Sequence, residues 1–388
     1  MIHPFMRPAI SLGLVLVLAS CARPAPLSPG PSPTADRRPN NLVLLVTDGG
    51  GLATWSLARM ALGADLAVAR MPVVGLVDTR EVDGGITDSA AGATAFAIGM
   101  RTFNGAIGVG PRCRALWARD SIAVLRDPAS CAPEPTLLER AEAAGKSTGL
   151  VTTTWVTDAT PAAFAAHVPD RYMHLEIAPQ MLASGVDVLL GGGRAVFDGT
   201  VDPTATDVLT EACQAADCPA DAATLAALRP SDRRLIGLFA PEDLPRAPAR
   251  SPDLPTMTRV ALERLARDED GFFLLVETEG TDTEQHANEP VEVVREEIVQ
   301  FDRAVAVALE FAERDPETLV VVTADHETGG MALHQAGGQW TLAYTGPGHT
   351  GAMVPLFAAG PGAERLRGFR DNDDVGRNLR ALLLGEDC

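Results

Sequence analysis

The chain has 388 residues, of which 46% are hydrophobic and 21% are charged, so it can form a large core in one or two domains. Its 32 Lys and Arg are outnumbered by 51 Asp and Glu, which gives a formal net charge of -19. Because such a chain repels polyanions, we expect no nucleic-acid partner.

The first residues are typical of an export signal. Arg7 precedes an apolar run at 9–19 that is too short to cross a bilayer, so we predict a signal peptide over residues 1–20. The run leads into LASC, ending at Cys21, which resembles the lipobox of bacterial lipoproteins, where the Cys becomes the lipidated first residue. Ala22 follows, which predicts an exported outer-membrane lipoprotein that faces the periplasm and is held to the membrane by the lipidated Cys21. The alternative is an ordinary secretory signal with an incidental Cys.

A proline-rich segment separates this signal from the folded part. Residues 22–40 contain six prolines among small residues, which predicts that 21–40 is a disordered or polyproline II tether. The folded domain is therefore expected over residues 41–388.

The cysteines of the folded part agree with export. We predict two disulfides of an oxidising compartment, and the remaining Cys388 lies at the terminus; the expected pairs are Cys113 with Cys131 and Cys213 with Cys218. A zinc site built from these four cysteines is the less favoured alternative, since the chain has no C-x-x-C pair.

Apolar runs alternate with helical patterns along the rest of the chain. The runs are Leu42–Val46, Val73–Val77, Gly149–Thr152, Val186–Leu190, Leu235–Phe239, Phe272–Val276, Leu319–Val322 and Val354–Ala358. This alternation predicts a three-layer α/β/α sandwich with a mostly parallel central sheet. The segments near 100–135 and 200–255 are irregular, and we predict small insertions there. In such sheets functional groups gather at the carboxyl ends of strands.

Two polar stretches follow the first strands. Asp48 precedes three glycines, which fits either a turn or a carboxylate ligand that the backbone approaches closely. Ser89 follows Asp88 and precedes a helix of small residues, where it could be a helix N-cap. Alternatively, it is a nucleophile whose oxyanion the helix N-terminus stabilises.

Further candidates lie around residues 158–171. Asp158 and Thr160 lead into a helix and could be turn and capping residues, or oxygen ligands of a hard cation. Arg171, eleven residues beyond Thr160, could then bind two phosphate oxygens with its planar guanidinium.

The last third of the chain carries the strongest metal signals. Glu277, Asp282 and His286 follow one apolar run and could be half of a metal site or only a solvated acidic loop. The adjacent Asp325 and His326 end the next run and are a stronger indication. His349 lies between glycines and by itself fits a loop residue better than a ligand.

Six motifs in this order resemble the alkaline phosphatases. They are DGGG at Asp48, TDSAAGATA around Ser89, TDATPAA followed by Arg171, VETEGTDTEQHANEP, TADHETGG and GHTGA. They extend from Asn41 to about Gly362 with matching internal spacing. The resemblance implies an alkaline-phosphatase-like fold and the hydrolysis of small phosphate monoesters through a phosphoserine.

The resemblance also implies two zinc ions and one magnesium ion. Asp282, His286 and His349 match the first zinc site; Asp48, Asp325 and His326 match the second, with Asp48 also reaching the magnesium; Thr160 and Glu277 match magnesium ligands, and Asp158 holds magnesium-bound water. Ser89 matches the nucleophile and Arg171 the phosphate-binding arginine, which Asp88 orients.

Other readings stay open beside this one. The family's homodimer is expected, yet only 22 residues separate His326 from His349, which leaves little room for the crown-like insertion of larger members. One alternative is a phosphodiesterase or sulfatase on the same metal scaffold, which Arg171 and the residues around Ser89 disfavour. Another is a non-catalytic surface protein that binds metal or phosphate, which would lack a ligand or the nucleophile.

Overall fold

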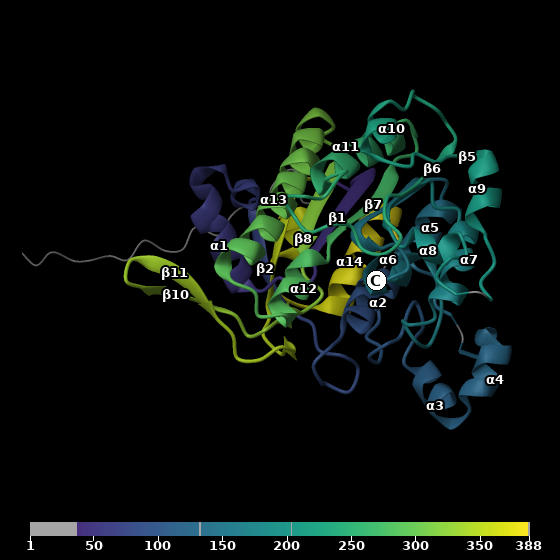
Figure 1. Ribbon diagram of the computed structural model, residues 1–388, viewed down its shortest axis with the longest axis horizontal. Coiled ribbons are helices and arrows are strands. Elements are labelled where there is room, and N and C mark those ends of the chain that lie inside the picture. The colour runs from purple at the N-terminus through teal and green to yellow at the C-terminus, as the bar shows by residue number, and fades with distance from the viewer. Residues whose placement is uncertain (1–36, 132, 203, 387–388) are drawn as a thin grey trace, which may run out of the picture. The chain divides into compact units, whose positions relative to one another are not determined.

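A ten-stranded sheet forms the centre of the domain (Figure 1). The computed structural model describes residues 37–386 apart from 132 and 203. The strands run in the order β14-β2-β13-β8-β1-β7-β3-β4-β6-β5, and only β13 is antiparallel to its neighbours. They are β1 (Asn41–Thr47), β2 (Val73–Asp78), β3 (Ser147–Trp155), β4 (Val188–Gly192), β5 (Ala216–Asp217), β6 (Arg234–Leu238), β7 (Phe272–Thr278), β8 (Thr318–Thr323), β13 (Val354–Ala359) and β14 (Gly368–Asp371).

Helices cover both faces of this sheet, as predicted for a three-layer sandwich. Successive residues of β1 point to opposite faces, so that Leu44 and Leu45 belong to two different hydrophobic cores. The Leu44 face carries α2 (Ser89–Ile98), α5 (Leu137–Ala143), α6 (Ala159–Ala165), α7 (His174–Ala183), α8 (Arg194–Phe197) and α14 (Asn372–Leu384). The Leu45 face carries α1 (Leu52–Leu62), α11 (Leu254–Leu265) and α13 (Val291–Arg314).

Each of the eight predicted runs overlaps a strand of the central sheet. They correspond to β1, β2, β3, β4, β6, β7, β8 and β13. The strands β1, β7 and β8 are buried along their whole length, which explains their continuous apolar sequences. The edge strands β5 and β14 were not predicted, because they are short and lack a continuous apolar run.

Residues 101–135 form a small unit beside the main cores. It contains α3 (Arg112–Arg119), α4 (Ser121–Arg126) and a 3-10 turn at Pro128–Cys131. Its own cluster includes Phe103, Val109 and Val124, and the disulfide between Cys113 and Cys131 closes it. The second predicted disulfide, between Cys213 and Cys218, is also confirmed.

The segment 200–255 is only partly an excursion from the main fold. α9 (Leu209–Ala215) and α10 (Ala222–Ala226) lie outside the strand pattern, whereas β5 and β6 extend the central sheet. The remaining 3-10 turns are at Gly63–Asp65, Ala67–Arg70 and Ala363–Leu366.

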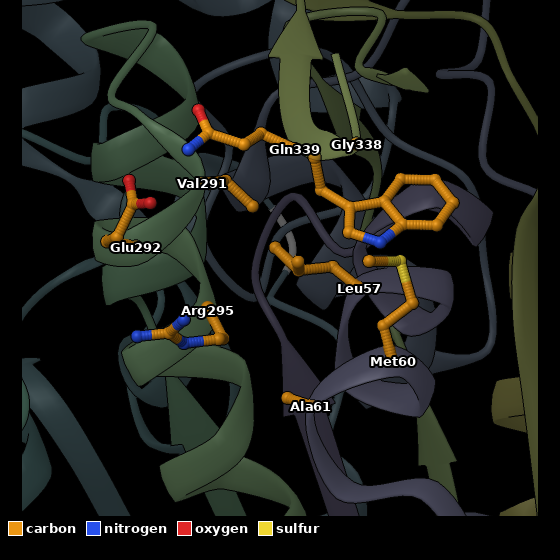
Figure 2. A pocket seen from close by; sticks show the side chains of 9 residues that line it. Leu57, Met60, Ala61, Val291, Glu292, Arg295, Gly338 and Gln339 are labelled. Carbon is orange, nitrogen blue, oxygen red and sulfur yellow. The ribbon is translucent and has the colours of Figure 1, made fainter. Parts of the chain in front are cut away.

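A hairpin occupies most of the interval between His326 and His349. β10 (Ala332–Ala336) pairs with β11 (Gln339–Ala343), while the short β9 (Glu327–Thr328) pairs with β12 (His349–Thr350). A cavity of about 530 Å³ lies between this hairpin, α1 and α13. Figure 2 shows side chains that line it. The cavity is lined in part by Leu57, Met60 and Trp340.

None of the helices described within 37–386 combines the length and the apolarity that crossing a membrane requires. The predicted signal peptide, Cys21, most of the tether and Cys388 lie outside the described residues.

Candidate active site

The carboxyl ends of the central strands bring the predicted residues to one edge of the sheet. Val46 of β1 pairs with Glu277 of β7 on one side and with Thr323 of β8 on the other. Asp48 and Asp325 therefore follow neighbouring strands at the same level as each other, two residues beyond the level of Glu277. α12 (Gly280–His286) begins directly after β7 and carries Asp282 and His286 on adjacent turns.

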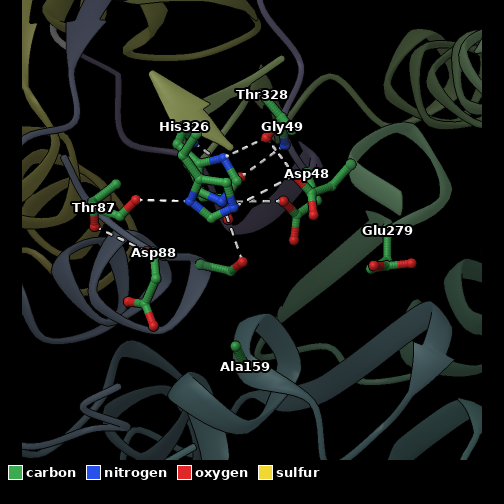
Figure 3. A network of polar contacts seen from close by, with 12 residues as sticks. Asp48, Gly49, Thr87, Asp88, Ala159, Glu279, His326 and Thr328 are labelled. Carbon is green, nitrogen blue, oxygen red and sulfur yellow. Dashed lines mark hydrogen bonds and ion pairs between the residues drawn. The ribbon is translucent and has the colours of Figure 1, made fainter. Parts of the chain in front are cut away.

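Asp48, Asp325 and His326 form one group of converging ligand atoms (Figure 3). The Nε2 atom of His326 lies 3.4 Å from Asp48 Oδ1 and 3.4 Å from Asp325 Oδ2. Both carboxylate oxygens are buried and have no hydrogen-bond partner. Buried polar atoms are normally satisfied, so this group fits a cation that accepts both oxygens and the imidazole.

Asp282, His286 and His349 form the second group. The Nε2 atoms of the two histidines are 3.0 Å apart, and His286 Nε2 is 3.1 Å from Asp282 Oδ2. Each Nδ1 faces a backbone carbonyl, that of Pro347 for His286 and that of Thr87, at 2.9 Å, for His349. An Nδ1–H that donates to a carbonyl leaves the lone pair on Nε2, so both lone pairs point into the group, as zinc ligands require.

Thr328 connects the two groups. Its hydroxyl donates to Asp282 Oδ1 and lies 3.2 Å from Nδ1 of His326. The rings of His326 and His349 stack with centroids 3.6 Å apart, so the groups are direct neighbours. Gly49 has a φ of 68°, and a Cβ there would lie 2.8 Å from both Asp282 Oδ1 and Thr328 Oγ1. Glycine is therefore required for this approach.

Ser89 lies beside the first group at the start of α2. Its Oγ is 3.2 Å from Nε2 of His326, and the residue is 4% exposed. The expectation that Ser89 could be the helix N-cap is wrong. Asp88 is the N-cap, because its carboxylate accepts from the backbone N–H of Ala91 and leaves the serine hydroxyl available.

The small residues of α2 let the helix pack directly on the end of β8. A Cβ on Gly92 would lie 2.8 Å from the backbone oxygen of Asp325. This contact explains the sequence SAAGATA, since a larger residue would push α2, and with it Ser89, away from His326.

Arg171 is held between two carboxylates. One terminal nitrogen donates to Asp158 Oδ1 at 2.9 Å, and the other lies 3.5 Å from Asp88 Oδ2. Burial opposes its charge, but the charges of Asp158 and Asp88 outweigh this and raise the pKa of Arg171 above its ordinary value. Asp88 was predicted to orient this arginine, and Asp158 makes the shorter contact.

The residues assigned to magnesium lie next to the first group but outside it. Thr152 donates to Glu277 Oε2 at 2.6 Å, and the charge of Asp158 and the hydroxyl of Thr160 both act on the Glu277 carboxyl. Asp158 is also the N-cap of α6, where it accepts from the N–H of Ala159, so its capping role and a ligand role coexist. Glu277 in turn faces the charge of Asp48.

Burial dominates the ionisation of the site. It raises the pKa of Glu277 to about 8 and that of Asp325 to about 7, and it raises the pKa of Asp48 well above its usual range. Burial likewise lowers the pKa of His326 and keeps it neutral. Burial opposes ionisation of Asp282 too, but in the metal-free protein the hydrogen bonds that it accepts from protonated His286 and from Thr328 hold its pKa at about 2.

Two residues near the ligand groups, Thr328 and Glu279, were not predicted from the sequence. Thr328 lies within the TADHETGG motif, yet nothing in its local pattern shows that it bonds to Asp282, which is 46 positions away. Glu279 is not among the predicted site residues. It accepts hydrogen bonds from the hydroxyl of Thr283, and its N–H donates to Thr153 Oγ1 at 3.0 Å. Figure 3 shows Glu279 on the far side of Asp48 from Asp88.

The fold and the site together define a class of protein. An α/β/α sandwich that presents two adjoining carboxylate and imidazole groups, a buried serine and a clamped arginine at one sheet edge is a metal-dependent hydrolase. Comparison with known proteins specifies the family. The alkaline phosphatase family model matches residues 39–345.

Individual relatives agree with this match. The chain is 37% identical to a streptomycin-6-phosphate phosphatase of Streptomyces griseus, with 98% of each chain covered. It is 32% identical to the alkaline phosphatase of Escherichia coli K12, over 90% of this chain and 87% of that one. The alkaline phosphatase structure of the Antarctic bacterium TAB5 superimposes with a TM-score of 0.77 at 30% identity, covering 89% and 98% of the two chains. The chain belongs to the alkaline phosphatase family and is a phosphatase.

Proposed function

We propose that this phosphatase hydrolyses phosphate monoesters through a phosphoserine at Ser89. The observation that carries the proposal is the position of the Ser89 hydroxyl, which is buried, free of capping duty and 3.2 Å from a histidine of the first ligand group. In the first step Oγ attacks phosphorus, the bond to the alcohol oxygen breaks, and the alcohol leaves with a proton. In the second step water attacks phosphorus, the bond to Oγ breaks, and inorganic phosphate is released.

The chain supplies two further elements for this reaction. Ser89 opens α2, so the N-terminal N–H groups of the helix favour negative charge beside Oγ. Arg171, fixed by Asp158 and Asp88, presents a planar fork for two phosphoryl oxygens in both steps. A monoester phosphate carries up to two negative charges and a diester only one, so the charge of Arg171 favours a monoester over a diester.

The two ligand groups suit two zinc ions, at Asp282, His286 and His349 and at Asp48, Asp325 and His326. The oxygens of Asp48, Thr160, Glu277 and Asp158 suit one magnesium ion. When bound, these ions supply the positive charge that stabilises the entering and leaving oxygens of phosphoryl transfer.

The test uses purified protein with zinc and magnesium, and 4-nitrophenyl phosphate beside bis(4-nitrophenyl) phosphate. We expect hydrolysis of the monoester and loss of at least about 100-fold in kcat for Ser89→Ala. A Ser89→Ala protein of unchanged rate would remove the phosphoserine, and faster turnover of the bis ester would favour the phosphodiesterase alternative. Metal binding without hydrolysis of either ester would support a non-catalytic protein.

We also propose export and anchoring through a lipidated Cys21, with a homodimer as the family's usual assembly. The support for export and anchoring is the sequence of residues 1–40 alone, whereas the homodimer rests on the family. Fractionation of cells that carry the natural chain or Cys21→Ser separates the outcomes, because only the lipidated form should remain in the membrane fraction. Light scattering of the purified protein gives its oligomeric state.

A further inference from the structure

A pocket separate from the hairpin cavity includes Asp88 and Arg171 in its lining. It has a volume of about 460 Å³, within the range of roughly 300–1,000 Å³ typical of small-molecule sites. Asp88 and Arg171 form its inner end, and Phe103, Trp117, Pro169 and Tyr172 contribute to its walls. We call it the α3 pocket, because Trp117 belongs to that helix.

Two segments that are far apart in sequence build the α3 pocket and are joined directly. Ile107 and Val168 exchange two backbone hydrogen bonds of 3.0 Å each. α3 itself is tied to the same unit by the buried disulfide between Cys113 and Cys131. The wall that carries Trp117 and the loop that carries Tyr172 are therefore held in a defined relation to Arg171.

The polar groups of the pocket are already engaged within the protein. Asn104 accepts from the N–H of Asp88 and donates to the carbonyl of Ile86. Arg114 pairs with Asp83, and Asp170 accepts from the N–H of Tyr172. Asp88 is occupied by the N–H groups of Ala91 and Gly105 as well as by Arg171.

The aromatic side chains of the α3 pocket are available to contact a ligand. Tyr172 is 78% exposed, and Trp117 is half-buried against the small cluster of residues 103–131. The Arg171 guanidinium lies 5.9 Å from the centre of the Tyr172 ring. A group attached to a phosphate held by Arg171 can thus reach this ring, and flat rings stack well on Tyr and Trp.

We propose that the α3 pocket binds the alcohol part of the substrate and selects phosphate monoesters whose alcohol part carries a planar ring that can reach Tyr172 and Trp117. This inference rests on the proposed function, because it places the phosphate at Arg171. Aryl-type esters and nucleotides share the required chemistry.

Matched substrates separate ring recognition from leaving-group reactivity. Benzyl phosphate and cyclohexylmethyl phosphate differ in planarity but release alcohols of similar acidity. We expect kcat/KM to favour the benzyl ester by about 2- to 12-fold, as aromatic pairing predicts. Adenosine 5′-phosphate against ribose 5-phosphate makes the same comparison for a nucleotide, so the two pairs distinguish the sources of the ring.

Variants of the pocket residues test whether the preference for a planar ring arises in the α3 pocket. Tyr172→Ala changes an exposed side chain and should lower both ratios towards one; Tyr172→Phe should keep the ratios. Trp117→Ala should act in the same direction. Trp340→Ala, an exposed aromatic at the separate hairpin cavity, is the control and should change nothing.

The outcomes are distinct. Ratios near one in the natural protein, or ratios that survive both Tyr172→Ala and Trp117→Ala, overturn the role of the pocket and leave the phosphomonoesterase standing. If the protein hydrolyses none of the four esters, the proposed function itself is wrong. A preference for cyclohexylmethyl over benzyl phosphate would indicate a merely apolar surface and also overturns ring selection.

Discussion

At the scale of single residues, Thr328 is the side chain that joins the two ligand groups. Its one proton is donated to Asp282, so its oxygen is left to accept from Nδ1–H of His326. This arrangement keeps the Nε2 lone pair of His326 directed at Asp48 and Asp325. One hydroxyl thereby orients a ligand in each group.

Replacing this hydroxyl tests its role. We expect Thr328→Val, which keeps the shape but removes both hydrogen bonds, to weaken zinc binding by about 10- to 100-fold, as for other partners of metal ligands. Equilibrium dialysis against a zinc chelator measures this without reference to activity. Thr328→Ser keeps the hydroxyl and should retain nearly the natural affinity. Equal zinc affinity in the Val variant would show that Thr328 only fills space.

At the scale of elements, the contact between α2 and β8 sets the distance from Ser89 to His326. An alanine in a helix normally stabilises by about 1 kcal/mol relative to glycine. At Gly92 the added Cβ would meet the Asp325 oxygen at 2.8 Å, and overpacking of this kind costs about 1–3 kcal/mol. The clash therefore outweighs the helix preference.

Gly92→Ala should accordingly lower the free energy of unfolding and move Ser89 away from its partner. Because a shift of about 1 Å can cost on the order of 100-fold in rate, we expect kcat to fall by about 10- to 100-fold. Gly110→Ala is the matched control, since a Cβ there would meet only ordinary contacts of 3.5 and 3.7 Å. A Gly92→Ala protein that is more stable and fully active would contradict the proposed packing constraint.

The same scale shows how far sequence reasoning reaches. The central strands could be predicted because burial on both faces demands continuous apolar runs such as Phe272–Val276. β14 could not, because an edge strand reading GFRD has no such pattern. The cap at Asp88 was missed because Asp and Ser are equally good caps, and only the packing of α2 decides between them.

At the scale of the whole molecule, the site concentrates acidic groups that the fold buries. In the metal-free protein Glu277 and Asp325 have pKa values of about 8 and about 7, whereas carboxyls of an unfolded chain titrate near about 4. The folded state therefore holds protons that the unfolded state has released, and its stability falls as the pH rises through this interval.

Removing metal ions with a chelator should reveal this dependence of stability on pH. We expect the free energy of unfolding of the chelated protein to drop by about 1–3 kcal/mol between pH 6 and pH 8, since one pKa unit corresponds to about 1.4 kcal/mol. Bound zinc and magnesium keep the carboxylates ionised, so the loaded protein should lack this drop. Denaturant unfolding at both pH values measures the difference, and Glu277→Gln should reduce it in the chelated form. Parallel pH profiles with and without metal would contradict the prediction.

The predicted ligand residues do converge, although their roles rest on a resemblance in sequence. Spacing along the chain could indicate Asp48, Asp325 and His326, because each follows a predicted strand whose ends must align. It could not indicate the α3 pocket, since that hollow depends on how residues 101–135 fold against the loop at 168–172.

The pairing of β12 with β9 completes the second ligand group, because it brings His349, which lies near the end of the chain, to Asp282 and His286. A polypeptide emerging from a ribosome therefore cannot complete both ligand groups until nearly all of it has been synthesised. We expect fragments that end before His349 to lack the second ligand group.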